Sequence, residues 1–459
     1  MSVQDLKHYS EFFSEYTELR IQENRSLLLA FVNGNLMRNE KNTTSGVSAR
    51  VYKSGSWGFS SNPDLNSNAI KSIIKEATDN ATFLDSRIKK NTKPLPLEIT
   101  SSQKDFSTKK SRLNQKELID FTKIVDDYIH KKYPDLISRT VVLRNLDMEK
   151  SVITSDKSAF YSMIPRSIFY VVLTAEKDGK PVELFDVFGG LGQFEDNFNS
   201  PDNLFNKIDK QYEHLMNKKE GVFANAGLRE CVLDSDLAGI LAHEAIGHTT
   251  EADLVLGGSV AADYMDKEIA SPLVSLVDFA NTYKGKTCPV PTFVDDEGTK
   301  SEDAVIIENG ILKSYMHNKE SANHFNVKPT GNARAYQFSD EPLIRMRNTA
   351  ILPGTGNLDE MISSVEDGYY LMKTNNGQAD STSEFMFGIP LGYEIKKGKL
   401  GRAIKDTTIS GIAFDVLKTI TAISGDMTWL CGGFCGKKQL ITVGMGGPAI
   451  KCKVNIGGR

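Results

Sequence analysis

Hydrophobic and polar positions alternate in short runs through the first 222 residues, and three longer stretches follow a helical period instead. Residues 46–52 alternate as half-buried strands do, 167–175 is another strand-like run, and the turn at 177–180 after it predicts a hairpin. Other strand-like runs are 27–32, 57–59, 140–143, 151–154 and 182–187, while helices are predicted over 65–83, 115–132 and 200–217. The polar, proline-containing stretch 92–110 predicts a linker or exposed loop.

The pattern changes after residue 222, where glycine-punctuated strand runs dominate. Hairpins are predicted over 304–316 and 392–404, and two strands, 440–444 and 449–454, close the chain. One strongly predicted helix begins near Asp236, and a shorter one covers 358–365. We therefore predict an α+β protein. A mixed α/β domain with antiparallel strands, 1–222, precedes a β-rich domain, 223–459, that carries the first of these helices; a further division of the N-terminal domain at about residue 110 is one option.

Composition narrows the class of protein and its partners. Of 459 residues, 40% are hydrophobic and 25% charged, and the net charge is −4, which is typical of soluble globular chains and gives no basic field for nucleic acid or an anionic membrane. No apolar run approaches the roughly 18 residues of a membrane span, and the N-terminus lacks a secretory apolar region. We therefore expect a cytoplasmic protein. Its five scattered cysteines predict reduced thiols rather than a disulfide framework.

Candidate chemistry is concentrated at residues 243–248, which read His-Glu-Ala-Ile-Gly-His. Two of the seven histidines flank a carboxylate here. Imidazoles bind divalent cations, zinc above all, and a catalytic zinc needs three protein ligands and one open position for water. The spacing leaves the third ligand open. The candidates are Glu251, Asp253, His317, His324, Cys431 and Cys435.

The spacing of the two histidines also predicts a distorted helix. At 100° per residue, His243 and His248 lie about 140° apart on a regular helix and cannot both reach one ion. A single wider, π-type turn would bring them roughly into line, and such turns gather at functional sites. Gly247 lies where the strain would fall and tolerates it. We therefore expect the helix to be distorted, or to end, near Gly247.

Further segments around this motif extend a family pattern. Residues 293–299, 307–316, 330–334 and 345–349 follow in order, and Cys435-Gly436-Lys437 stands near the end. Together with HEAIGH, these segments resemble the TldD/PmbA family of metallopeptidases, often labelled modulators of DNA gyrase, over nearly the whole chain. That family has a metal-bearing type and a partner type without the histidines. This chain retains both histidines and Glu244 and so resembles the metal-bearing TldD type.

The resemblance implies specific roles and partners. It implies Zn²⁺ as cofactor, His243, His248 and Cys435 as its ligands, and short or unfolded peptides as substrates. Glu244 would serve as the catalytic base. The resemblance also implies a homodimer, or a heterodimer with a histidine-less paralogue. One departure is Cys431, which in this position would compete as a ligand or form a disulfide with Cys435.

Two other functions are weighed against peptide hydrolysis. A catalytically silent metal-binding assembly subunit of a TldD/TldE-like complex would need the histidines but not Glu244. Binding to DNA or gyrase follows from the family label, but the acidic balance and the lack of a basic helix argue against direct nucleic-acid binding.

Some polar residues carry open interpretations. Asp295, Asp296 and Glu297 form a second ion site or a solvated acidic loop. Arg345 and Arg347, on alternating positions of one strand, clamp a carboxylate or pair with acidic neighbours. Tyr315, His317 and Arg334 are candidates for stabilising the oxyanion of the reaction, or are structural.

Overall fold

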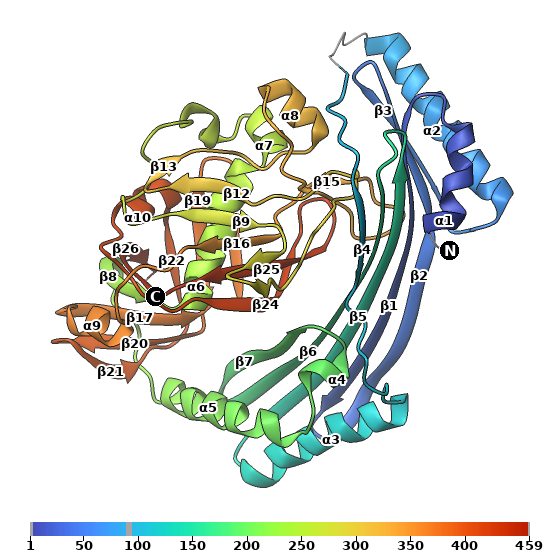
Figure 1. Ribbon diagram of the computed structural model, residues 1–459. Helices are drawn as coiled ribbons and strands as arrows, with labels where there is room; N and C mark the ends of the chain where they lie inside the picture. The colour runs from blue at the N-terminus through green and yellow to red at the C-terminus, as the bar shows by residue number, and fades with distance from the viewer. Residues whose placement is uncertain (1–2, 89–93, 458–459) are drawn as a thin grey trace.

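The N-terminal part folds around one long, curved sheet (Figure 1). A computed structural model describes residues 3–88 and 94–457. The sheet order is β3-β2-β1-β5-β6-β4, with β7 also paired to β6, and only β4 runs parallel to its neighbour. The strands are β1 (Tyr16–Val32), β2 (Asn35–Lys53), β3 (Ser56–Asn62), β4 (Ser101–Asp105), β5 (Ser138–Thr154), β6 (Ala159–Lys177) and β7 (Lys180–Leu191).

Helices cover the outer face of this sheet, and the inner face curves around the C-terminal part (Figure 1). In β1, Leu19 and Ile21 pack against α2, and Leu27 and Leu29 belong to the cluster under α3 and α5. Because strand side chains alternate, even-numbered residues such as Arg20 point the other way, where Arg20 donates to C-terminal carbonyls. The helices are α1 (Val3–Leu6), α2 (Ser67–Ile88), α3 (Gln115–Lys132), α4 (Phe194–Asn197) and α5 (Asp202–Lys219), with a 3₁₀ turn at Lys7–Phe12.

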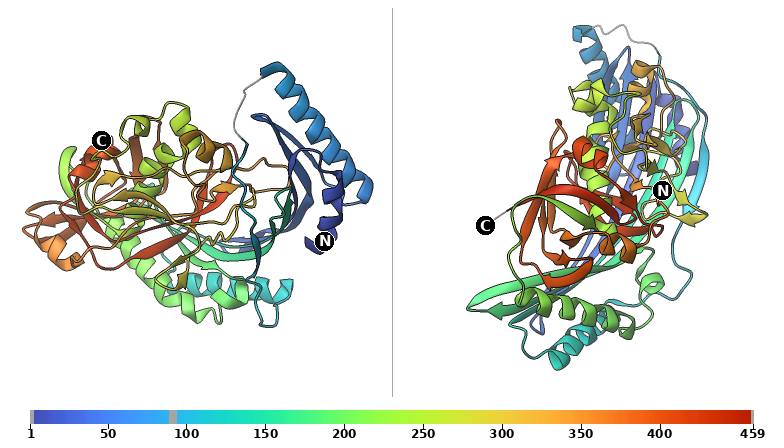
Figure 2. Two further views of the ribbon diagram at one scale, coloured as in Figure 1. Left: turned by 45° about the horizontal axis from the view of Figure 1, so that its top comes forward. Right: turned by 90° about the vertical axis from the view of Figure 1, so that its left-hand side faces the viewer.

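Two sheets build the C-terminal part (Figure 2). Both share one hydrophobic core with α6 (Ser235–Ile240), the helix that leads directly into the histidine motif. The six-stranded sheet has the order β13-β12-β9-β16-β25-β24. Its strands are β9 (Leu276–Phe279), β12 (Ala304–Glu308), β13 (Ile311–Leu312), β16 (Asn348–Ile351), β24 (Thr428–Cys435) and β25 (Ile441–Gly447).

The nine-stranded sheet has the order β18-β19-β22-β26-β8-β17-β20-β21, with β23 on β26. Its strands are β8 (Gly227–Leu233), β17 (Asp367–Lys373), β18 (Asn376–Ala379), β19 (Glu384–Ile389), β20 (Leu391–Lys396), β21 (Lys399–Ala403), β22 (Thr407–Ile412), β23 (Ala422–Ile423) and β26 (Ile450–Ile456). Short elements connect these sheets: β10 (Thr282–Tyr283), β11 (Lys286–Thr287), β14 (Ala333–Arg334), β15 (Leu343–Ile344), α7 (Ala252–Leu256), α8 (Lys319–Phe325), α9 (Leu358–Ser363), α10 (Ala413–Lys418) and a 3₁₀ turn at Val260–Asp263.

The predicted α+β class is confirmed, with differences in detail. The runs 140–143 and 151–154 are parts of the single strand β5, and the expected linker contains β4; residues 92 and 93 of that linker lie outside the described residues. The short helices α8 and α10 were not predicted. The division at residue 222 stays a prediction, although strands from both expected N-terminal lobes join one sheet. Within the described residues, no helix is both long and apolar enough to span a membrane.

Buried ion pairs join the two parts of the molecule. Asp296 lies 2.7 Å from Lys150 of β5, and Glu297 lies 2.6 Å from Arg50 of β2. All three acidic residues at 295–297 are buried. The expectation of a solvated acidic loop is therefore wrong. The alternative of a second ion site is not supported either, because lysine and arginine side chains of the N-terminal sheet already neutralise Asp296 and Glu297.

Candidate metal centre

A π-helical turn carries the histidine motif. Residues Leu241–Gly247 form this turn after α6, and a 3₁₀ turn, His248–Thr250, follows at once. The wider turn brings the ring centroids of His243 and His248 to 5.2 Å. The predicted distortion near Gly247 is confirmed. A Cβ at Gly247 would lie 2.0 Å from the sulfur of Met346, so the packing at this position also requires a residue without a side chain.

Cys435 reaches the same point from the last position of β24. His243, His248 and Cys435 each offer one ligand atom, and these atoms all lie within 4.8 Å of one another. The Cys435 Sγ is 3.3 Å from His248 Nε2. Neither ring nitrogen of the buried His243 has a hydrogen-bond partner among the described residues. Burying an unpartnered imidazole is costly, and a cation with nitrogen and sulfur ligands would relieve that cost.

Electrostatics favour the ligand form of the cysteine. Burial alone would raise the pKa of the Cys435 thiol, but the two adjacent imidazoles lower it to about 4. Burial likewise disfavours the charged form of His248, yet Cys435 and Glu251 together raise its pKa well above the usual value. The thiolate, which is the form that binds metals, is therefore stabilised at neutral pH.

Glu251, which is paired with Lys437, contacts the His248 ring nitrogen that does not face Cys435. The fully buried Glu251 carboxylate lies 3.0 Å from His248 Nδ1 and 3.2 Å from Lys437 Nζ, and Lys437 also pairs with Asp253 at 2.7 Å. A carboxylate on the second nitrogen of a ligating histidine fixes the orientation of the ring. Glu251 and Asp253, weighed above as ligands, thus support the site from outside it. The sequence signal for this role was the lysine of the Cys-Gly-Lys segment, which sequence reasoning did not use.

Glu244 borders a cleft of about 380 Å³ beside these residues. Its side chain is 23% exposed, and its Oε2 lies 3.6 Å from His248 Nε2. The cleft is bounded by α6, by β6 and β7 of the N-terminal sheet, by Gly377 of β18, and by residues 429–434 of β24. A carboxylate is therefore placed between the group of ligand atoms and a space open to a substrate.

The other candidate residues lie apart from this group. Cys431 stands four residues before Cys435 on β24, roughly 10–13 Å away at strand spacing, so it is too far for a disulfide. His317 contacts Ser321, and His324 is exposed on α8. The Tyr315 hydroxyl donates to Ala261, and Arg334 donates to Thr442. These two residues and His317 do not line the cleft, so the structure does not support them as oxyanion residues.

The two arginines have structural roles. Arg347 lies 2.8 Å from the Asp278 carboxylate, and both are fully buried. Arg345 is fully buried as well, and it donates to the carbonyls of Cys435, Lys437 and Gln439. A clamp for a substrate carboxylate at these positions is therefore wrong, and Arg345 instead fixes the loop that presents Cys435.

Comparison with known proteins identifies the family. The family model described as PmbA/TldA metallopeptidase C-terminal domain matches residues 227–458. This chain belongs to the PmbA/TldA metallopeptidase family. The model of domain 1 of the same family matches residues 17–81. The metallopeptidase class that the sequence predicted is thereby confirmed.

Relatives extend the match over the whole chain. A metalloprotease TldD homolog of Buchnera aphidicola subsp. Schizaphis graminum is 30% identical and covers 98% of this chain and 93% of that protein. A zinc metalloprotease TldD homolog of Saccharolobus solfataricus is 29% identical and covers 90% of each chain. TldE from Thermococcus kodakarensis shares the fold, with a TM-score of 0.78, 15% identity and coverage of 100% of both chains. A putative modulator of a DNA gyrase from Thermotoga maritima also shares it, with a TM-score of 0.77, 19% identity and coverage of 99% of both.

Proposed function

We propose that this protein is a zinc-dependent peptidase that hydrolyses peptide bonds in short or unfolded peptides. The observation that carries the proposal is the convergence of His243, His248 and Cys435 beside the Glu244 cleft. Two nitrogens and one sulfur leave the fourth tetrahedral position of zinc open, as a catalytic site requires. The Saccharolobus relative is named a zinc metalloprotease, which supports the choice of metal.

The residues of this chain divide the catalytic work. A zinc ion, when bound, would polarise the scissile carbonyl and acidify water. Glu244 is not one of the three converging ligands, and it takes the proton from water and passes one to the leaving amine. Glu251 holds the Nδ1 of His248, so that Nε2 faces Cys435. The thiolate of Cys435 would bind the cation tightly but would make it a weaker Lewis acid than neutral ligands would.

The shape of the cleft supports extended peptides as substrates. Its walls include β24 and β18, each the last strand of its sheet, and an exposed strand edge pairs with an extended chain through the backbone. Two carbonyls of β24 already accept hydrogen bonds from side chains: Arg166 donates to that of Cys431, and the Tyr170 hydroxyl donates to that of Gly432. A volume of about 380 Å³ admits a few residues of an unfolded chain but no folded domain.

The dimer and the cytoplasmic location stay part of this proposal. A homodimer, or a pairing with a histidine-less paralogue, is tested by measuring the mass of the purified protein alone and together with such a paralogue. The alternative of a catalytically silent metal-binding subunit is less well supported, because Glu244 is partly exposed in the cleft rather than buried in a structural contact.

Zinc content and peptide turnover, measured on the same samples, test the proposal. Glu244→Gln should retain about one zinc per chain and lose at least about 100-fold in turnover of an unstructured fluorogenic peptide. Cys435→Ala should lose both zinc and turnover. Cys431→Ala, a matched cysteine on the same strand, controls for zinc content and should keep it.

Each result has a distinct meaning. Full zinc stoichiometry in Cys435→Ala would place the third ligand elsewhere. An active Glu244→Gln variant would require another base. A zinc-loaded wild-type protein that cleaves no peptide would support the silent subunit instead.

A further inference from the structure

Two arginines next to the cleft face no carboxylate. The Arg144 side chain of β5 is exposed, and its guanidinium carbon lies 5.0 Å from the centre of the Phe434 ring. Arg166 of β6 is only 7% exposed and donates to two carbonyls, those of Cys431 and Pro289. Within residues 3–88 and 94–457, no ion pair joins either guanidinium to an acidic side chain. Arg166 is thus largely desolvated, Arg144 is covered on one side by the Phe434 ring, and neither is neutralised by a carboxylate.

The register of the sheet places both side chains on its inner face. Arg144 lies opposite Leu28 on one side and Ile168 on the other, and Arg166 lies opposite Leu146. The alternate residues, Leu143 and Phe169 among them, pack in the core under the outer helices. Arg144 and Arg166 therefore point into the space between the sheet and the C-terminal part.

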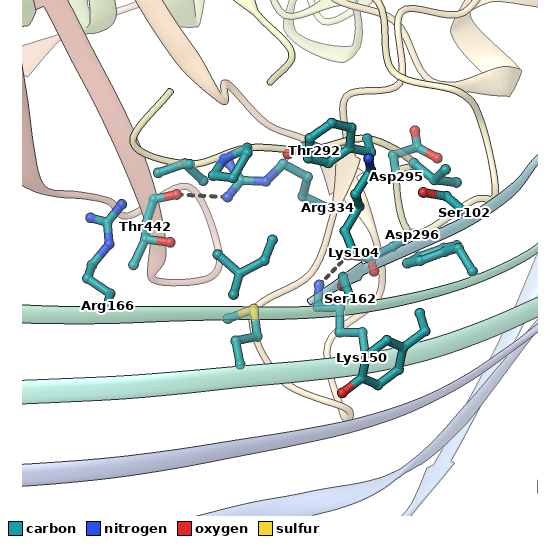
Figure 3. Close-up of a pocket in the computed structure, with 18 of the residues that line it drawn as sticks. Ser102, Lys104, Lys150, Ser162, Arg166, Thr292, Asp295, Asp296, Arg334 and Thr442 are labelled. Atoms are coloured by element: carbon teal, nitrogen blue, oxygen red, sulfur yellow. Dashed lines mark hydrogen bonds and ion pairs between the residues drawn. The ribbon is translucent and has the colours of Figure 1, made fainter. Parts of the chain in front are cut away.

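Three cavities lie in succession along this inner face. The Glu244 cleft shares Phe434 with a middle cavity of about 170 Å³. The middle cavity shares Leu146 and Arg166 with a third, narrower one of about 70 Å³. Figure 3 shows the third cavity, with Lys104, Lys150, Arg166 and Arg334 among the side chains that line it. The middle cavity, which both arginines line, is therefore separated from the Glu244 cleft by no more than the shared Phe434 side chain.

Charge changes sign from the cleft to the other two cavities. The cleft is lined by the carboxylates of Glu244 and Asp236 and by the ion pair of Asp186 with Lys373, so its net charge is negative. Among the described residues that line the middle cavity, the single carboxylate is Glu40, which lies 3.9 Å from Arg38. In the third cavity, Asp296 is already paired with Lys150 at 2.7 Å. Arg144 and Arg166 therefore give the middle cavity uncompensated positive charge, and Lys104 and Arg334 add to it in the third cavity.

We propose that Arg144 and Arg166 form a subsite that binds a carboxylate of the peptide substrate. A guanidinium binds a carboxylate through charge-assisted hydrogen bonds, and partial desolvation strengthens them. Phe434 and Cys435 are neighbours on β24, so one side chain faces Arg144 while the next faces the histidines. The bound carboxylate would therefore lie within a few residues of the cleaved bond. It belongs to the C-terminus of the peptide or to an Asp or Glu side chain.

This inference rests on the proposed function, and matched peptides test it. One unstructured fluorogenic peptide is made in four forms, with Glu or Gln near the cleaved bond and with a free or an amidated C-terminus. The neutral form is the peptide with Gln and an amidated C-terminus, and the acidic forms are those with Glu, a free C-terminus or both. The wild type should cleave at least one acidic form with a kcat/KM about 10-fold above that of the neutral form, mainly through a lower KM. Arg144→Gln should reduce that ratio to within about twofold and still cleave the neutral form, and Arg144→Lys should restore part of it.

Arg87→Gln is the matched control, because Arg87 is also exposed and lies 5.4 Å from a phenylalanine ring, that of Phe83 on the outer helix α2. This variant should keep the preference of the wild type. Loss of rate on amidation alone assigns the carboxylate to the C-terminus, and loss on Glu-to-Gln exchange alone assigns it to a side chain.

Equal kcat/KM for all four peptides would overturn the subsite and leave the proposed function standing. If the wild type cleaves no peptide, the proposed function fails separately. Binding of the same labelled peptides to Glu244→Gln, followed by fluorescence anisotropy, then decides the subsite: equal affinity for acidic and neutral forms would overturn it.

Discussion

Replacing Gly247 by alanine tests whether the π-helical turn needs a residue without a side chain. The backbone of Gly247 is helical, with φ −54° and ψ −53°, so alanine suits the conformation. The space does not suit it. The new Cβ would lie 2.0 Å from Met346 Sδ and 3.2 and 3.3 Å from its Cε and Cγ. Because Met346 is fully buried, it can move only by displacing other core residues.

Two opposing effects set the magnitude. Alanine in place of glycine stabilises a helix by about 0.5–1 kcal/mol. Overpacking a dense core costs about 1–3 kcal/mol, and contact with three atoms of one buried side chain favours the upper half of that range. Gly247→Ala should therefore lower the free energy of unfolding by about 1–2 kcal/mol. Because His248 follows directly, zinc affinity should also fall, by about 10-fold.

Urea denaturation of the metal-free protein and competition with a zinc chelator measure the two effects. Gly257→Ala is the control, because its new Cβ would meet only ordinary contacts, the nearest at 3.4 Å. Met346→Ala alone should cost about 2–5 kcal/mol. In the double variant, the new methyl fills part of that cavity, so the two losses should be less than additive by about 1–3 kcal/mol. Additivity within about 0.5 kcal/mol would refute the steric reasoning.

Three further predictions concern the residues around the site. Glu251→Gln should weaken zinc binding about 10- to 100-fold in chelator competition, whereas Asp253→Asn, which leaves the contact to His248 intact, should change it little. Arg345→Met should lower the free energy of unfolding by about 2–5 kcal/mol in urea, because it leaves carbonyls of the Cys435 loop unpaired. Burial, and to a smaller extent repulsion by the Glu297 carboxylate, raises the pKa of Asp295 to about 7, above the unfolded value of about 3.9. Its contribution to stability is therefore present at low pH and lost as pH rises from 4 to 7, so Asp295→Asn should become more stable relative to wild type over that range.

The histidine motif was predictable from the sequence because its argument is local geometry. A step of five residues on a regular helix separates His243 and His248 by a fixed angle, and only a wider turn removes that angle. The role of Cys435 did not follow from such reasoning. It stands 187 residues from His248, and spacing over that length says nothing about position. The family resemblance alone pointed to this residue as a ligand, and its position beside the two histidines agrees with that prediction.

Burial of charge was the feature that the sequence could not reveal. An acidic run such as 295–297 looks solvated until its cationic partners are known, and these lie more than 140 residues earlier in the chain, on another sheet. The same holds for Arg345, because its partners are backbone carbonyls, which every residue carries whatever its type. Alternating apolar and polar residues predict which face of a strand is covered, but not what covers it.

Buried cations explain why segments so distant in sequence form one site. Arg345 fixes the loop after β24 through three carbonyls, and Lys437 in that loop reaches Glu251 behind His248. The ligand loop and the histidine turn are thus connected twice, once by charge and once by the proposed metal. A scaffold fixed in this way orients its ligands before any cation binds, which lowers the entropy cost of binding. Glu244, unlike the fully buried Glu251, remains partly exposed in the cleft, and the proton transfer proposed for it requires that exposure.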